Sequence, residues 1–123
     1  MAAAHFKLEK LIAFLDYNRC QVDGYVDDIC SLEPVEAKWS GFGWHVQRVD
    51  GHNLSQILVA LDVAQRTPGA PHMIIADTVK GKGISYMENR PEWHSQPISE
   101  GHYGVAMADL DAIELSLNEE GLE

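Results

Sequence analysis

The sequence is poor in cysteine and lacks long apolar runs, and each shortage excludes a class of protein. Its 123 residues include two cysteines, Cys20 and Cys30, too few for a secreted disulfide scaffold and not spaced as zinc ligands. No basic segment followed by an apolar core lies near Met1, so we expect no secretory signal. The longest apolar run is far below the roughly twenty residues that cross a bilayer. These absences predict a cytoplasmic protein without a membrane partner.

Basic residues are also scarce. Nine Lys and Arg residues stand against 19 Asp and Glu residues, which gives a formal net charge of −10. A nucleic-acid partner is therefore not expected, because clustered positive charge holds phosphate backbones. An anionic ligand requires local compensation by a divalent cation, a lysine and a histidine. The chain is long enough for one domain that buries roughly two-thirds of its unfolded surface.

Residues 11–24 combine a short apolar run with a cluster of polar residues. The run from Leu11 to Leu15 is short, bulky and unbroken, which predicts a parallel strand buried on both faces. Ligands of open α/β sheets bind beyond the carboxyl ends of such strands, where Asp16 and Asn18 lie. The Asn18 side-chain oxygen and the following backbone carbonyls are suitable ligands for a hard cation. The alternative is that Asn18 only caps a turn.

Downstream, apolar spacing predicts strands that alternate with helices. Residues 44–49 and 72–76 are predicted strands, joined by a helix whose cap is either Asn53 or Ser55. A strand, a helix and a strand in this order imply a right-handed parallel crossover. The predicted fold class is therefore α/β, with a parallel sheet flanked by helices. The residues expected on the inner face of the connecting helix, by their i, i+3, i+4, i+7 spacing, are Leu54, Ile57, Leu58 and Leu61.

The remaining segments are predicted from weaker patterns. Residues 1–10 are expected to end a helix with Phe6 facing inward, and residues 22–32 to form a loop. A short helix is expected to begin at Glu33-Pro34, with Val35 and Trp39 on its inner face. The last predicted helix runs over residues 105–117 and packs against the domain or a partner, and residues 119–123 are expected to fray.

A basic, glycine-containing turn follows the second predicted strand. Within residues 78–83, two glycines permit close backbone approach, and Lys80 and Lys82 supply positive charge. Its alternative is a solvated basic turn. Residues 84–101 are predicted to be irregular and to lie over the ligand end, with Trp93-His94 near their middle. A histidine beside a tryptophan is also compatible with simple packing or exposure.

Three segments in this order resemble transketolases. Residues 16–24 (Asp-Tyr-Asn-Arg-Cys-Gln-Val-Asp-Gly) are similar to the second half of the family's thiamine diphosphate and magnesium motif. Residues 42–53 and 78–94 are similar to two further family segments. The resemblance implies the thiamine-diphosphate-binding fold, with residues 1–123 as a partial diphosphate-binding domain, incomplete at its amino end. The family's upstream Gly-Asp-Gly segment has no counterpart here. A truncated coding sequence is the expected reason, with a gene split at an unusual point or a decayed copy as the alternatives.

The resemblance also implies a role for each candidate residue. Asn18 would ligate Mg²⁺ through its side-chain oxygen and Cys20 through its backbone carbonyl, with Ca²⁺ or Mn²⁺ as substitutes. The Cys20 thiol would be incidental, because Mg²⁺ prefers oxygen to sulfur. Lys80 would contact the phosphates of thiamine diphosphate. His94 would contact the diphosphate and the sugar hydroxyls near the reacting carbon, which makes it the candidate catalytic residue.

The family's reaction transfers a two-carbon ketol unit between sugar phosphates. The resemblance implies that this chain contributes the phosphate-binding side of the site and needs a carboxyl-terminal transketolase subunit or homologous chain for activity. The alternative is a non-catalytic remnant that only associates with intact subunits. Without the Gly-Asp-Gly carboxylate, the isolated chain is expected to bind the cofactor weakly, expose apolar surface and associate. It is expected to be inactive alone, and the sequence does not specify which sugar phosphates it uses.

Overall fold

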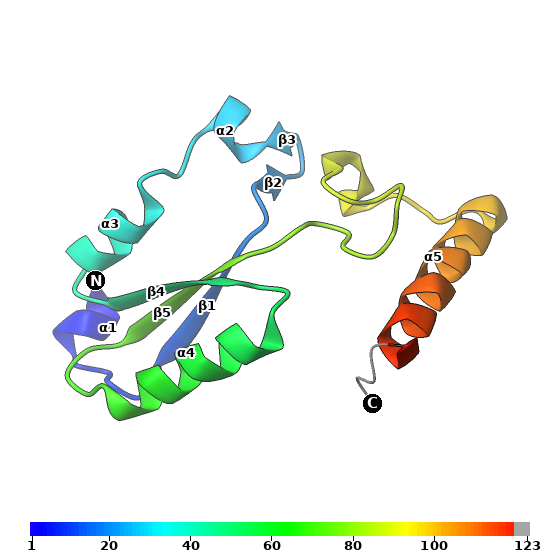
Figure 1. Cartoon of the computed structure of the whole chain (residues 1–123). Coiled ribbons are helices and arrows are strands. Elements are labelled where there is room, and N and C mark those ends of the chain that lie inside the picture. Colours follow the sequence, from blue (N-terminus) through cyan, green and yellow to red (C-terminus); the bar gives the residue numbers. More distant parts are fainter. Residues whose placement is uncertain (120–123) are drawn as a thin grey trace. The chain divides into compact units, whose positions relative to one another are not determined.

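The computed structural model describes residues 1–119, which divide into two compact units. The sheet unit comprises Met1–Asn18 and Cys30–Thr78. The hairpin unit comprises Arg19–Ile29 and the residues from Val79 onward. Figure 1 labels the helices and strands of both units.

The sheet unit is built on three parallel strands. The strands are β1 (Ile12–Tyr17), β4 (His45–Asp50) and β5 (His72–Asp77), in the spatial order β1-β5-β4. In the two registers, Ile12 and His45 both pair with His72. The central strand β5 is buried from His72 to Ala76, and its Ile74 and Ile75 are completely inaccessible. Both faces of an apolar strand need cover from water, and a strand in the middle of a parallel sheet has this cover.

Helices cover both faces of this sheet. Helix α4 (Leu54–Arg66) connects β4 to β5, while α3 (Val35–Gly41) lies on the opposite side of the sheet in Figure 1. On the α3 face, the buried cluster is Tyr17, Val35, Met73 and Ile75, with Trp39 and Trp44 packed against it. The predicted parallel sheet flanked by helices is confirmed, as is the inward orientation of Val35 and Trp39.

The cap of α4 is settled by a hydrogen bond. Asn53 has an extended backbone, and its side-chain oxygen accepts from the Gln56 backbone N–H at 3.1 Å. An asparagine in this position satisfies one of the free N–H groups at the start of a helix. Asn53, not Ser55, is therefore the cap.

The predicted inner face of α4 is wrong in part. Leu54 and Leu58 are 74% and 65% exposed, whereas Ala60 and Ala64 are 2% and 4% exposed. The small alanines allow the helix to approach the sheet closely, and the Gln47 side-chain amide on β4 donates to the Ala60 carbonyl at 3.0 Å. The helix therefore has a second apolar stripe that remains exposed.

Two predictions for the first residues are also wrong. Strand β1 lies at the edge of the sheet, and Phe14 is 49% exposed, so the strand is not buried on both faces. The first helix, α1 (Ala2–His5), is only four residues long, and Phe6 follows it with 70% exposure. Among the described residues, β1 has a neighbouring strand on one side only, and α1 is too short to form a packed face.

The hairpin unit contains more secondary structure than predicted. Strands β2 (Cys20–Gln21) and β3 (Gly24–Tyr25) pair antiparallel within the expected loop, and α2 (Val26–Ile29) follows. Gly24 has a φ of 146°, which a glycine adopts readily at the end of a tight turn. The segment predicted to be irregular contains the 3₁₀ helix η1 (Pro91–His94).

The last helix, α5 (Glu100–Glu119), begins earlier than predicted. The Ser99 hydroxyl accepts from the His102 backbone N–H at 3.2 Å, which caps the added turn. The expected fraying covers residues 119–123, of which 120–123 lie outside the described residues. Of the helices described, α5 included, none combines the length and the apolar character needed to cross a membrane.

Candidate functional site

The carboxyl ends of β1 and β5 meet at one edge of the sheet unit. Asp16 pairs with Ala76 and Tyr17 with Asp77, and Asn18 and Thr78 directly follow the last residues of the two strands. The Thr78 hydroxyl donates to Asp16 Oδ1, and Asn18 Nδ2 donates to Asp16 Oδ2 at 3.4 Å. One carboxylate thus receives a donor from the end of each strand.

Gly51 closes this corner from the third strand. A Cβ built on Gly51 would lie 2.4 Å from Thr78 Cγ2 and 3.0 Å from the Asp77 carbonyl oxygen, so only a hydrogen fits. Its backbone N–H donates to the same Asp77 carbonyl at 2.8 Å. The turn after β4 is therefore packed directly against Thr78.

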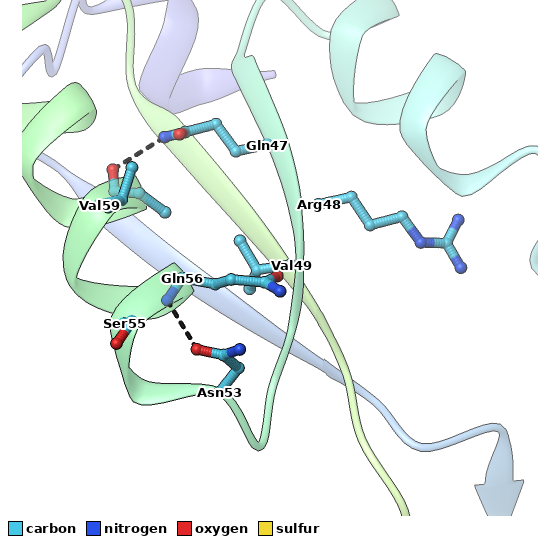
Figure 2. Close-up of a pocket in the computed structure, with 8 residues that line it drawn as sticks. Gln47, Arg48, Val49, Asn53, Ser55, Gln56 and Val59 are labelled. Atoms are coloured by element: carbon cyan, nitrogen blue, oxygen red, sulfur yellow. Dashed lines mark hydrogen bonds between the residues drawn. The ribbon is translucent and has the colours of Figure 1, made fainter.

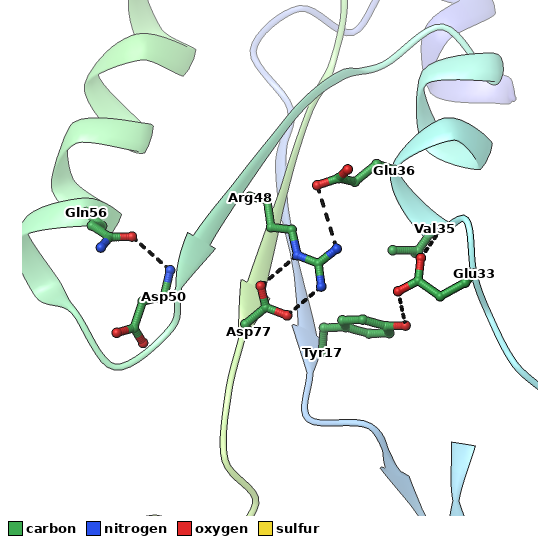
Figure 3. A network of polar contacts seen from close by, with 8 residues as sticks. All are labelled: Tyr17, Glu33, Val35, Glu36, Arg48, Asp50, Gln56 and Asp77. Atoms are coloured by element: carbon green, nitrogen blue, oxygen red, sulfur yellow. Dashed lines mark hydrogen bonds and ion pairs between the residues drawn. The ribbon is translucent and has the colours of Figure 1, made fainter. Parts of the chain in front are cut away.

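The opposite face of the same edge carries an ion-pair network (Figure 3). The Arg48 guanidinium on β4 contacts both carboxylate oxygens of Asp77 on β5, at 2.7 Å and 2.8 Å. It lies 3.8 Å from Glu36 and its central carbon is 5.4 Å from the ring centroid of Tyr17. The hydrogen bond to Asp77 is the main reason that the pKa of Arg48 is raised above its ordinary value. This pairing joins β4, β5 and the start of α3.

Tyr17 extends the network to the residues before α3. Its ring is 3% exposed, and its hydroxyl donates to Glu33 Oε1 at 2.8 Å. The other Glu33 oxygen accepts from the Val35 backbone N–H at 3.1 Å. A carboxylate that bonds a first-turn N–H stabilises the start of a helix. The network therefore fixes α3 to the end of β1.

Cys20 and Lys80 lie in the hairpin unit. Burial raises the pKa of the Cys20 thiol, the nearby Lys80 ammonium lowers it, and Glu92 raises it. The Lys80 carbonyl accepts from the Asn89 backbone N–H at 2.9 Å, which closes the turn after β5. Lys82, by contrast, is exposed and lies 3.6 Å from Glu88. Of the two lysines, Lys80 is the one beside the β2–β3 hairpin.

His94 ends η1 and is exposed. Its neighbour Trp93 packs against Tyr86 and His102, with ring centroids 4.8 Å and 4.9 Å apart. His102 also contacts Ser99, whose hydroxyl oxygen is 3.1 Å from its Nδ1. This aromatic cluster was not predicted from the sequence, although the three-residue spacing from Ser99 to His102 is typical of a helix start.

The candidate residues are thus divided between the two units. Asn18 belongs to the sheet unit, whereas Cys20, Lys80 and His94 belong to the hairpin unit. Their assigned roles in metal and cofactor binding remain predictions. Within residues 1–119, no group of three or more His, Cys, Asp or Glu side chains could hold a metal ion.

A groove of about 410 Å³ lies elsewhere in the sheet unit, between β4 and the first half of α4 (Figure 2). None of the candidate residues lines it. In Figure 2 the Arg48 side chain points away from α4, and Figure 3 shows it in contact with Asp77. The groove therefore offers no cation to a phosphate and is not part of the candidate site. Its lining is Gln47, Arg48, Val49, Asn53, Ser55, Gln56, Val59 and Ala60.

The fold and its motifs define a thiamine diphosphate-binding α/β domain. Residues 1–110 match the family described as "Transketolase, thiamine diphosphate binding domain". The chain belongs to the transketolase family. The resemblance inferred from three segments is thereby confirmed.

Sequence relatives include subunits of enzymes with different sugar substrates. The chain is 46% identical over 111 residues to the 6-deoxy-6-sulfo-D-fructose transketolase subunit SqwG of Clostridium sp. (strain MSTE9), covering 90% of this chain and 40% of the relative. It is 37% identical over 110 residues to one of the apulose-4-phosphate transketolase subunits of Actinobacillus succinogenes, covering 89% and 40%. This chain therefore spans about two fifths of these subunits.

Solved transketolase structures also resemble this chain. Transketolase from Campylobacter jejuni superposes with a TM-score of 0.79 at 28% sequence identity, covering 87% of this chain and 17% of that chain. Transketolase from Leishmania mexicana, at 23% identity and a TM-score of 0.65, shares the fold over 98% of this chain and 22% of that chain. The described residues thus correspond to a minor part of a complete transketolase.

Proposed function

We propose that this chain contributes the phosphate-binding side of a transketolase site that binds Mg²⁺ and thiamine diphosphate. The observation that carries the proposal is the similarity to named transketolase subunits over about nine tenths of this chain. In the assembled enzyme a second, carboxyl-terminal chain completes the site. The reaction is transfer of a two-carbon ketol unit between sugar phosphates.

The donor atoms of the chain fit a magnesium diphosphate. The Asn18 amide turns its nitrogen toward Asp16 and therefore its oxygen away from that carboxylate. The Cys20 backbone carbonyl supplies a second neutral oxygen, and its thiol takes no part because Mg²⁺ prefers oxygen to sulfur. Asn18 and Cys20 would thus hold Mg²⁺ through two neutral oxygens, and oxygens of the diphosphate and water would be needed to complete its ligands.

Lys80 and His94 are the proposed contacts to the phosphates. Lys80 is half-buried, and its charge offsets part of the charge on the diphosphate. His94 is exposed, which leaves its ring accessible to both the diphosphate and the sugar substrate. Thiamine diphosphate supplies the carbon chemistry when bound, and these residues hold and orient it. The His94 ring also offers an N–H donor to substrate hydroxyls near the reacting carbon.

Calorimetric titration tests this proposal. Thiamine diphosphate with Mg²⁺ is titrated into the purified chain, first alone and then with a carboxyl-terminal transketolase subunit. We expect weak binding to the chain alone, because two neutral oxygens hold Mg²⁺ poorly. Saturable, Mg²⁺-dependent binding is expected in the mixture and should be lost in Asn18→Ala and Lys80→Ala.

Two matched variants control for general damage. Asn118→Ala changes an exposed asparagine of α5, and Lys82→Ala removes the lysine that faces Glu88. Both should bind like the unmodified chain. Absence of heat in both titrations would overturn the proposal and favour a chain that keeps the fold and associates without binding cofactor.

A further inference from the structure

We propose that Asp16 is a positioning residue that fixes the side-chain amide of Asn18 for cation binding. This inference rests on the proposed function, in which the Asn18 oxygen is a ligand of Mg²⁺. Asp16 itself need not touch the cation or the cofactor. It acts through Asn18, and Thr78 holds it in place.

The strand geometry brings the two side chains together. Asp16 is the penultimate residue of β1, and Asn18 follows the strand by one residue. Successive side chains along a strand alternate between faces, so residues two apart share one. The contact between Asn18 Nδ2 and Asp16 Oδ2, at 3.4 Å, follows from this spacing.

The chemistry of the pair dictates which way the amide points. A carboxylate only accepts hydrogen bonds, whereas the Asn18 amide has a donating nitrogen and an accepting oxygen. Turning the oxygen toward Asp16 would place two acceptors together. Asp16 therefore selects the orientation in which the Asn18 nitrogen faces inward, and the oxygen is directed away from the carboxylate.

The second carboxylate oxygen anchors Asp16 to the neighbouring strand. It accepts from the Thr78 hydroxyl, directly after β5. Thr78 is in turn confined by Gly51, whose missing Cβ would lie 2.4 Å from its methyl carbon. Because Thr78 anchors one oxygen of the Asp16 carboxylate, the other oxygen is held where it accepts from the Asn18 side-chain nitrogen.

The consequence is a ligand oriented before the cation arrives. Residues that orient a metal ligand without touching the metal typically affect metal affinity by about 10- to 100-fold when they are replaced. We expect Asp16→Asn to raise the Mg²⁺ concentration at half-saturation by that factor. Thr78→Val keeps the Asp16–Asn18 contact and should raise it by about threefold or less, because only the anchor is lost.

The first test uses the free chain and needs no metal. The side-chain ¹H–¹⁵N signals of Asn18 are identified by their loss in Asn18→Ser and compared between variants. We expect these signals to shift and their hydrogen exchange to accelerate in Asp16→Asn, with little change in Thr78→Val. Unchanged Asn18 signals in a folded Asp16→Asn chain would overturn the proposal.

The second test uses the chain mixed with a carboxyl-terminal transketolase subunit. Mg²⁺ is titrated at fixed thiamine diphosphate, and thiamine diphosphate is titrated at saturating Mg²⁺. In Asp16→Asn only the first curve should move, because saturating Mg²⁺ overcomes a misoriented ligand. Equal displacement of both curves would indicate a general structural role and would count against positioning.

The two tests separate this inference from the proposed function. If the unmodified mixture binds no Mg²⁺, the proposed function fails. The Asn18 signals of the free chain then still decide whether Asp16 fixes the amide. If the unmodified mixture binds Mg²⁺ and Asp16→Asn binds it with the same half-saturation, the proposed function stands and the positioning role is excluded.

Discussion

The sheet unit and the hairpin unit differ in how much of their structure is enforced by burial. In the sheet unit, the central strand β5 is buried over five consecutive residues and pairs on both sides. In the hairpin unit, α5 has no buried residue over its 20 positions, and the two paired strands are two residues each. Packing therefore determines the sheet unit, whereas turns, caps, polar contacts and one aromatic cluster determine the hairpin unit.

This difference bears on the candidate site. Asn18 stands at the end of a strand that a packed core supports, so its position is set before any ligand binds. Lys80 and His94 belong to segments with few buried neighbours, which favours a role for ligand or partner contacts in ordering them. Substitutions of the same kind should therefore change the free energy of unfolding by different amounts in the two units.

The largest difference in the free energy of unfolding is expected between alanine substitutions of two isoleucines. Ile75→Ala in β5 should lower the free energy of unfolding by about 2–5 kcal/mol, because the side chain is fully buried. Ile113→Ala in α5, at 41% exposure, should cost about 1 kcal/mol or less. Urea unfolding monitored by tryptophan fluorescence measures both. Equal losses would show that the hairpin unit is as tightly packed as the sheet unit.

Alanine substitutions at two glycines should change stability in opposite directions. Gly51→Ala should destabilise by about 1–3 kcal/mol, because the added methyl group collides with Thr78 and the Asp77 carbonyl. Gly104→Ala in α5 should stabilise by about 0.5–1 kcal/mol, since its Cβ would meet nothing within 4 Å and alanine favours a helix. Thermal unfolding of the two variants checks the signs, and a stabilised Gly51→Ala would contradict the tight corner.

Two arginines test the polar contacts. Arg48→Met should cost about 1 kcal/mol, because it removes the two-point contact between the guanidinium and the Asp77 carboxylate. Arg19→Met removes one contact to Asp27, at 3.2 Å between half-exposed side chains, and should cost less. Urea unfolding at low and high salt measures both. Equal stability losses for the two variants at low salt would contradict the stronger pairing of Arg48.

The smallest expected effect concerns Asp109 on α5. Hydrogen bonds from the Ser85 backbone N–H and then from its hydroxyl lower the pKa of Asp109 below 3.8. Its contribution to stability is therefore present above pH 3.8 and is lost as the pH falls through the lowered pKa. Ser85→Ala removes only the hydroxyl, so the pKa should rise part of the way. Carboxyl ¹³C titration by NMR measures it, and an unchanged pKa would exclude the contact.

The order of the sheet elements could be predicted because local patterns are strong there. The apolar run of β5, the alternation in β4 and the cap at Asn53 each specify one structure. The inner face of α4 could not be predicted, because both of its stripes are apolar and side-chain size, not polarity, decides which one meets the sheet. The β2–β3 hairpin was missed because a two-residue turn through Val22 and Asp23 gives little periodic signal.

The candidate site was predictable only where one segment carries the chemistry. Asn18 could be placed at a strand end from the run that precedes it, and the structure agrees. The pairing of Arg48 with Asp77 joins residues 29 positions apart, and no spacing rule predicts it. The contact of Asp16 with Thr78 likewise depends on the register of β1 against β5. Such contacts can be predicted only when the register between the strands is known.

The strand order β1-β5-β4 also has a kinetic consequence. His72 pairs with both Ile12 and His45, so the loop that attaches β1 is roughly twice as long as the loop that attaches β4. Each doubling of loop length costs about 0.6 kcal/mol in closure entropy. The β4–α4–β5 crossover should therefore assemble first during folding, and β1, which carries Asn18 at its end, should dock last. The candidate metal ligand would then be among the final parts of the sheet unit to reach its native position.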